Sequence, residues 1–438
     1  MVARPVRAIH RACRLPLAFF ALIASIVAAS ILDIAGARFA EQIGMMAGAI
    51  SLFAASNSAQ MSDRDHFFRA SSGVRWPILF ILIVIVVQLA PVGLAIAHPI
   101  WTSVRDSVGG MAFGYVTADV ALTLNALFLA LTATALTAVA ILVARDRGRA
   151  ERLLFVLSAV TTLAALALNL SRISPALIRA SPLGLATTLG GFGLLLNLAV
   201  MQLAVERAER RHALSRSLVV GACGLLGALI NAIAIFLFSG ANSALAAGVG
   251  IVLFLLILLV RRLDLSAIAA AVLSIAALLG TAIVLTYAFE RSSGAALLRL
   301  VFEFPDAAKA TLERMLADTR WLGAGAGTFS AIARIYQSDA KEWVAPSAAI
   351  SIFIDAGWIG LVAALTASVA LLLRLFSGSL SRGRDSFFPA ASAACICFSL
   401  VEAFAGPGLL QPAAILCLSA IVGLGLSQSV SQSPRTGN

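Results

Sequence analysis

Long apolar runs with almost no charged residues recur along the whole chain, and they constrain its fold more than any other feature. Crossing a lipid bilayer as a helix takes roughly 18 or more such residues, and five runs qualify: residues 78–97, 120–144, 183–205, 217–260 and 265–289. Charged residues make up 12% of the chain, about half their share in a soluble globular domain. The sequence therefore predicts an all-α, polytopic membrane helix bundle.

The run at residues 217–260 is too long for one crossing, and a polar turn at residues 238–243 divides it into two. We expect about twelve transmembrane helices, with both termini in the cytoplasm. Basic residues concentrate in the cytoplasmic loops of membrane proteins, and this topology leaves only four in the short outer loops: Arg38, Arg105, Arg172 and Arg179. The net charge of +11 thus reflects membrane topology, and we expect no nucleic acid partner.

The predicted topology divides the chain into four parts. Residues 1–288 form an N-terminal bundle of about nine spans, and residues 289–346 form an extracytoplasmic loop. Residues 347–427 supply about three further spans, and residues 428–438 form a polar, disordered tail. The loop alone mixes many charges with apolar residues over a long stretch, which separates it from the rest of the chain.

The first half of this loop has the residue spacing of an amphipathic helix. Apolar residues recur at helical intervals from Leu297 to Leu316. Oppositely charged residues four apart support a helix as well: Arg299/Glu303, Lys309/Glu313 and Arg314/Asp318. We expect a helix that lies on the outer membrane boundary or packs over the mouth of the bundle. Pro305 either starts its main part or kinks it.

Two features follow this helix. Gly323, Gly325 and Gly327 alternate with other small residues in the sequence Trp-Leu-Gly-Ala-Gly-Ala-Gly-Thr-Phe, which permits a backbone bend and the close approach of another group. Their spacing is wrong for a dinucleotide-binding loop, and on their own they indicate a turn between helices. Asp355 lies two to three turns into the next apolar helix, where an ionisable residue is a functional candidate. The alternative is a carboxylate that is wet or paired with an arginine.

In this order, the two features resemble motifs of the O-antigen ligase/polymerase superfamily of bacterial envelope polysaccharide enzymes. Members carry a stretch like PLxGxGxGxF in an extracytoplasmic loop and then a segment like AHNxxLxxxxExGxxG entering a helix. Residues 321–329 match the first motif, and five positions match the second in register: Ala345, Ile350, Asp355, Gly357 and Gly360. Arg299 stands where family members have an arginine before the glycines. The similarity covers residues 290–365.

The chain departs from the family pattern at two places. The His-Asn pair of the second motif falls on Pro346 and Ser347, and a second family arginine falls on Asn242. If the family histidine activates the acceptor hydroxyl, another group must do so here. The candidates for the general base are Asp355, Asp339, Glu342 and His98.

The resemblance implies transfer of a glycan from a polyprenyl diphosphate carrier to an acceptor hydroxyl, in O-antigen or exopolysaccharide assembly at the bacterial inner membrane. Its implied partners are that lipid-linked glycan, membrane lipid and other polysaccharide-assembly proteins, with no metal or cofactor. Guanidinium groups suit a diphosphate because they stay charged and match phosphate oxygens. We predict Arg299 and Asp355 as catalytic residues, and a wider set for binding the diphosphate and glycan: Arg172, Arg179, Arg299, Gly323, Gly325, Gly327 and Arg334.

The sequence is also compatible with two other functions. Twelve helices with both ends inside also fit a transporter or flippase, although we find no internal repeat and few ionisable residues in the spans. The replacements at Pro346 and Asn242 instead suggest a catalytically inactive family member that assists polysaccharide assembly. Surface glycan length separates these possibilities from the polymerase or ligase.

Overall fold

The structure is a computed structural model that describes residues 14–36, 39–93, 97–107, 113–174, 183–209, 214–239, 241–263, 272, 276, 280, 306–336, 344–381 and 385–430. Its first half contains α2 (Arg14–Ile34), α3 (Ala40–Ser58), α4 (Met61–Ala70), α5 (Arg75–Gln88), β1 (Pro91–Val92), α6 (Ile100–Ser107), β2 (Gly114–Tyr115), α7 (Val120–Val143) and α8 (Arg147–Ile173). The remaining elements are α9 (Leu183–Glu209), α10 (Leu214–Phe238), α11 (Ala241–Arg262), α13 (Asp306–Asp318), α14 (Phe329–Tyr336), α15 (Ala348–Ser381), α16 (Phe387–Ala405), the 3-10 turn η1 (Gly408–Leu410) and α17 (Pro412–Ser429).

These helices confirm the all-α polytopic fold. Within the described residues, nine helices are long and apolar enough to cross a membrane: α2, α7 to α11 and α15 to α17. A tenth candidate is the pair α4 and α5, which meet at a bend of 83°. The second predicted crossing coincides with α3, and most of the ninth, residues 265–289, lies outside the described residues. The chain is a multi-pass membrane protein.

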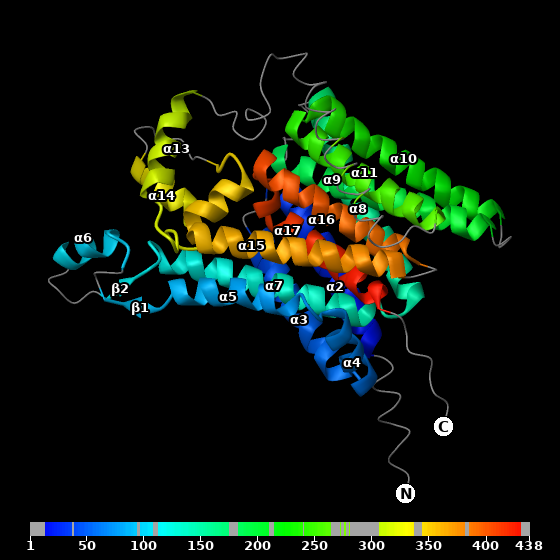
Figure 1. Cartoon of the computed structure of the whole chain (residues 1–438), viewed down its shortest axis with the longest axis horizontal. Coiled ribbons are helices and arrows are strands. Elements are labelled where there is room, and N and C mark those ends of the chain that lie inside the picture. The colour runs from blue at the N-terminus through cyan, green and yellow to red at the C-terminus, as the bar shows by residue number, and fades with distance from the viewer. Residues whose placement is uncertain are drawn as a thin grey trace, which may run out of the picture.

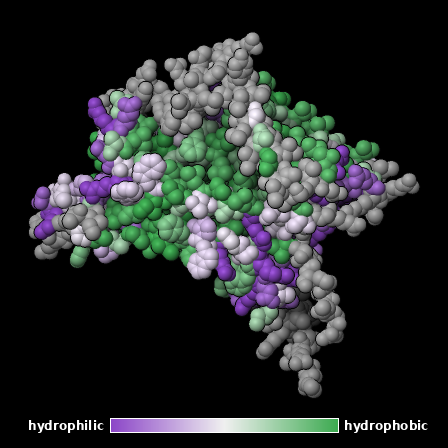
Figure 2. Space-filling model, viewed as in Figure 1, coloured by the Kyte–Doolittle hydropathy of each residue, from purple (hydrophilic) through white to green (hydrophobic). Residues whose placement is uncertain are grey.

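Small side chains let the central helices pack closely. In α16 and α17 the share of residues buried inside the protein is 78% and 83%, against 33% in α10. Small residues make up eight of the 19 residues of α16 (alanine and serine) and eight of the 18 residues of α17 (alanine, serine and glycine). Such residues allow close helix contact in membranes. The exposed leucines of α10, among them Leu218, Leu226 and Leu237, face outward. Figure 2 shows hydrophobic residues across the middle of the molecule, as expected for a surface in contact with lipid.

The two ends of the bundle differ in their elements (Figure 1). The β1–β2 hairpin, α6, α13 and α14 lie together at one end, while α4 and the C-terminal end of α17 lie at the other. Hydrogen bonds connect the second group: His66 of α4 to Ser427 of α17 at 3.2 Å, and Arg374 of α15 to the Arg69 carbonyl at 3.0 Å. We call these the hairpin end and the α4 end.

One predicted span boundary is wrong. The apolar run at residues 78–97 was expected to cross as one helix, but α5 ends at Gln88 and the chain turns into the β1–β2 hairpin. The physical reason is that the Gln88 amide and its carbonyl pair with other segments at the hairpin end, and Pro91 has no N–H to continue a helix. The predicted division at residues 238–243 is confirmed, because α10 ends at Phe238 and α11 begins at Ala241.

Candidate functional site

Residues 320–329 form a tight loop between α13 and α14, which we call the glycine loop. Gly323, Gly325 and Gly327 have φ angles of 69°, 115° and 75°, a region that residues with a side chain rarely adopt. The loop runs beside the start of α15, where the Ala324 and Gly325 N–H groups donate to the carbonyls of Ile354 and Asp355 at 2.9 and 2.8 Å. Backbone hydrogen bonds therefore hold the loop against α15.

Each glycine of the loop faces a different neighbour. A Cβ on Gly323 would come within 2.5 Å of the Asp355 carbonyl, and one on Gly325 within 2.0 Å of the Thr117 hydroxyl. A Cβ on Gly327 would meet Ala126 of α7 at 3.3 Å. The alternating glycines thus allow the loop to fit between α15, the hairpin and α7.

The loop also interrupts α15. Gly357 has φ 67° and ψ −166° inside this helix, and a Cβ there would lie 2.1 Å from the Trp321 carbonyl oxygen. The same carbonyl accepts a hydrogen bond from the Ile359 N–H at 3.3 Å. A carbonyl of the loop therefore interrupts the backbone hydrogen bonds of α15. Such insertions are a known cause of sharp helix kinks.

Gln88 connects α5, the loop and α15 through one fully buried amide. Its Nε2 donates to the Leu322 carbonyl at 2.6 Å and the Asp355 carbonyl at 2.9 Å, and its Oε1 accepts from the Ala326 N–H at 2.9 Å. The sequence patterns above do not single out this residue. The available signal was an amide in an otherwise apolar run, where polar groups need partners.

The Asp355 carboxylate lies at the N-terminal end of α14. Its Oδ2 accepts hydrogen bonds from the Ser351 hydroxyl at 3.1 Å and the Gly327 N–H at 3.2 Å, and the Thr328 and Phe329 N–H groups also interact with it. The N-terminal end of a helix favours negative charge. The other oxygen, Oδ1, is buried and has no direct hydrogen-bond partner among the described residues.

A pocket of about 450 Å³ opens beside this carboxylate. It is lined by residues from the glycine loop, α14, the start of α15 and the turn before α17: Gly327, Phe329, Ser330, Arg334, Val344, Ala345, Ser351, Asp355, Pro407, Leu410 and Gln411. The pocket therefore combines one carboxylate, one guanidinium and several hydroxyl and amide groups. Such a mixture suits a polar ligand with hydroxyl and anionic groups.

A small hydrophobic cluster holds the walls of this pocket in place. Leu312 and Met315 of α13 pack with Phe329 and Ile332 of α14 and with Ile350 of α15, all buried. The described part of the predicted amphipathic helix starts at Asp306, immediately after Pro305, and packs over the hairpin end. The described part of this helix therefore contacts α14 and α15.

The structure brings together three of the predicted site residues. Asp355, Gly327 and Arg334 line the same pocket, whereas Gly323 and Gly325 are enclosed by protein atoms. Arg172 is exposed at the last turn of α8 and does not line this pocket. Arg299 and Arg179 lie outside the described residues. The functional roles assigned to all of these residues remain predictions.

The remaining candidates for a general base are less favourably placed than Asp355. His98 lies in the hairpin and does not line the pocket. Its pKa is lowered from the ordinary value of 6.5 by burial and by the positive charge of Arg320, and Arg320 donates to the neighbouring Ala97 carbonyl at 3.2 Å. Asp339 and Glu342 lie outside the described residues.

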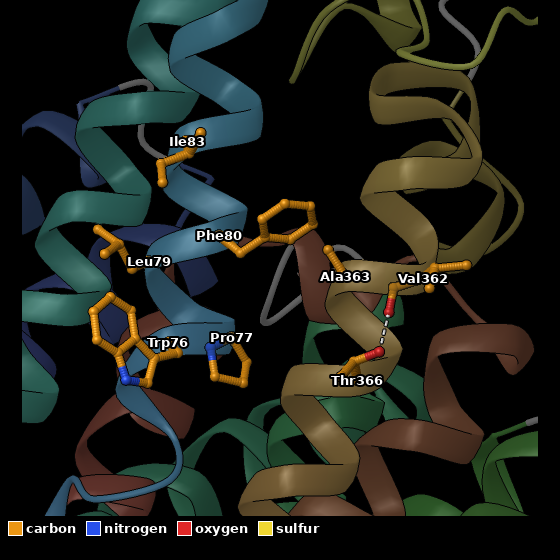
Figure 3. A pocket seen from close by; sticks show the side chains of 8 residues that line it. All are labelled: Trp76, Pro77, Leu79, Phe80, Ile83, Val362, Ala363 and Thr366. Atoms are coloured by element: carbon orange, nitrogen blue, oxygen red, sulfur yellow. Dashed lines mark hydrogen bonds between the residues drawn. The ribbon is translucent and has the colours of Figure 1, made fainter.

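A second cavity, of about 490 Å³, lies between α5 and α15. Figure 3 shows the Phe80 side chain pointing across this cavity toward Ala363, and the Thr366 hydroxyl donating a hydrogen bond to the Val362 carbonyl. Its lining is almost entirely apolar: Trp76, Pro77, Leu79, Phe80, Ile83, Val362, Ala363 and Thr366. Because α15 spans the membrane, this groove is a surface that suits a hydrocarbon chain.

Comparison with known proteins gives no further assignment. No family model matches the chain, and no curated protein matches it either.

Proposed function

We propose that the chain is a membrane polymerase or ligase that transfers a glycan from a polyprenyl diphosphate carrier in O-antigen or exopolysaccharide assembly. The observation that carries the proposal is the pocket in which Arg334 and the Asp355 carboxylate line the same cavity. The apolar groove between α5 and α15 adds a surface that fits the carrier's hydrocarbon tail. On the positive-inside argument the hairpin end faces away from the cytoplasm.

The proposed reaction needs little chemistry from the protein. The acceptor hydroxyl oxygen forms a bond to the anomeric carbon, and the bond from that carbon to the diphosphate oxygen breaks. The diphosphate leaves with the electron pair, and the Asp355 carboxylate takes the proton of the hydroxyl. Arg334, together with Arg299, stabilises the charge that develops on the departing diphosphate.

The test is complementation of a gene deletion, with the length distribution of the surface glycan as the readout. We expect Arg334→Ala and Asp355→Asn to reduce polymer formation by about a hundredfold, the typical effect of removing one transition-state contact. Arg299→Ala is expected to behave in the same way. Arg314→Ala is the matched control, because Arg314 is an exposed arginine of α13 that does not line the pocket.

Each outcome of this experiment has a defined meaning. Normal glycan in the Arg334→Ala and Asp355→Asn strains, with protein amounts equal to wild type, would remove the proposed catalytic site. A shortened glycan in the deletion strain that the Arg334→Ala and Asp355→Asn variants restore would instead favour an inactive family member that assists assembly.

One observation favours a transporter as the second candidate. α15 is broken at Gly357, two residues after a buried carboxylate, and discontinuous helices often bind substrate or ions in secondary transporters. Unchanged glycan in the deletion strain, with altered uptake of a small solute into vesicles, would support this function.

A further inference from the structure

A second buried carboxylate lies away from the proposed catalytic pocket. Glu402 occupies the last turn of α16 and is 1% exposed. It lies among α9, α11 and α16, and it does not line the pocket of Asp355 and Arg334. The proposed glycan chemistry assigns it no role, yet a carboxylate buried in a membrane protein is costly and calls for a partner.

Hydroxyl groups surround one oxygen of this carboxylate. Glu402 Oε1 lies 3.4 Å from Thr188 Oγ1 of α9 and 3.3 Å from Ser243 Oγ of α11. Its other oxygen, Oε2, is buried without a hydrogen-bond partner among the described residues. Within the described part of the chain, these two hydroxyls are the side chains that interact with the Glu402 carboxylate, and no basic side chain does so.

The distances between Glu402 Oε1 and the two hydroxyl oxygens are long for hydrogen bonds to a carboxylate. A hydroxyl that bonds a carboxylate usually lies about 2.5–2.7 Å away, so 3.3 and 3.4 Å are long for such bonds. Two neighbouring oxygens that share one cation at about 2.4 Å, with a right angle at the cation, are separated by about 3.4 Å. The two observed separations lie at the long end of the range for direct hydrogen bonds, and they match the edge length of an oxygen-lined cation site.

The backbone of η1 packs closely beside this cluster. A Cβ on Gly408 of η1 would lie 1.9 Å from the Gly184 carbonyl oxygen and 2.2 Å from Thr188 Oγ1. Only a glycine therefore lets η1 pack directly on the beginning of α9. Glu402 also stands close to the end of α16, where the unpaired carbonyls of a helix favour positive charge.

We propose that Glu402, Thr188 and Ser243 bind a monovalent cation of the size of sodium. A single carboxylate balances one positive charge, and two hydroxyls supply neutral oxygen ligands from two further helices. The bound cation connects α9, α11 and α16 at the hairpin end, and it stabilises the arrangement of helices behind the catalytic pocket. This site is independent of the proposed glycan transfer.

The test is thermal unfolding of the purified full-length protein in detergent, titrated with sodium chloride against choline chloride at constant ionic strength. We expect the melting temperature to rise with sodium alone, since a ligand that binds only the folded state stabilises it. Glu402→Gln should abolish the rise while preserving the side-chain shape. Glu209→Gln, an exposed carboxylate at the far end of α9, should retain it.

Ser243→Ala keeps the test decisive if the glutamine variant does not fold. Removing one oxygen ligand should raise the half-saturating sodium concentration about tenfold, equivalent to about 1.4 kcal/mol. Equal stabilisation by choline, or an unchanged sodium response in Glu402→Gln, would overturn the proposal. A stability that depends on pH but not on sodium would also overturn it, because the carboxyl would then hold a proton instead.

Discussion

The hairpin end and the α4 end of the bundle stabilise charge in different ways. At the α4 end, acidic and basic side chains pair directly: Arg145 with Asp63, Arg207 and Arg147 with Glu151, and Arg147 with Asp385. At the hairpin end, the hydrogen bonds of buried carboxylates come from hydroxyls and backbone N–H groups. Asp33 accepts from the Ala413 N–H at 3.0 Å, and Asp355 and Glu402 follow the same pattern.

This difference indicates where the molecule can bind something. An ion pair already satisfies both of its charges, so the α4 end is suited to fixing helix positions and orientation in the membrane. A buried carboxylate with an unused oxygen retains capacity for an external group. The hairpin end holds two such oxygens, Oδ1 of Asp355 and Oε2 of Glu402, and both proposed sites lie there.

The largest expected effect comes from a glycine at the hairpin end. Gly357→Ala places a Cβ about where the Trp321 carbonyl oxygen lies, which adds a steric clash to an unfavourable φ. We expect a loss of about 3–5 kcal/mol in stability, measured by thermal unfolding in detergent. The control is Gly73→Ala near the α4 end, which has φ 82° but open space around its Cα. It should cost only about 1–2 kcal/mol, and equal losses would show that the fit of the loop is not tight.

Gln88 offers the next largest effect. Gln88→Leu leaves the Leu322 carbonyl and the Ala326 N–H without their side-chain partner in a buried site, and we expect a loss of about 2–4 kcal/mol. Limited proteolysis should then cut the glycine loop faster than in wild type. Gln42→Leu changes an exposed glutamine of α3 and serves as the control. A Gln88→Leu protein with normal stability and protease resistance would contradict the role assigned to this amide.

A smaller effect is expected from the ion pairs of the α4 end. Glu151→Gln removes the partner of two arginines, whose side chains are 38% and 30% exposed. Because solvent screens such pairs, we expect a loss of only about 1 kcal/mol. The difference from wild type should shrink further in high salt. A loss as large as that of Gly357→Ala would mean that both ends contribute equally to the fold, and the comparison would fail.

The smallest effect is a pH dependence at the hairpin. Burial and Arg320 lower the pKa of His98 below 6.5 in the folded chain, so the folded state binds this proton less readily than the unfolded state. The neutral imidazole therefore contributes stability above pH 6.5, and this contribution is lost as the pH falls through the lowered pKa. Melting curves of wild type and His98→Gln should diverge at neutral pH and converge in acid. Constant separation at every pH would contradict this assignment.

Much of the fold was predictable because hydropathy is a local property. The crossings at α7, α9, α10 and α11 follow from uninterrupted apolar runs, and the turn at residues 238–243 follows from its polar residues. The end of α5 was not predictable in this way. The Gln88 carbonyl pairs with the Thr117 N–H, and its side chain binds residues more than 200 positions further along the chain. Hydropathy contains no information about such contacts.

The candidate site was predictable only in part. Sequence patterns selected Asp355 and Arg334, and the structure places both in one pocket. They also selected three glycines as one set, but only Gly327 lines that pocket, while Gly323 and Gly325 fit against α15 and Thr117. Glu402 was missed because its significance depends on hydroxyls of α9 and α11 that lie far from it in sequence.

The sequence by itself determined that this chain is a bundle of membrane-crossing helices, because the cost of exposing apolar residues to water and backbone groups to lipid is set segment by segment. The tertiary structure alone decided which polar groups meet. The glycine loop reaches α15 through positive φ angles, and this contact forms one pocket around Asp355 and leaves a second carboxylate, Glu402, among three helices. Such groupings depend on distance in space, which a linear pattern of residues does not specify.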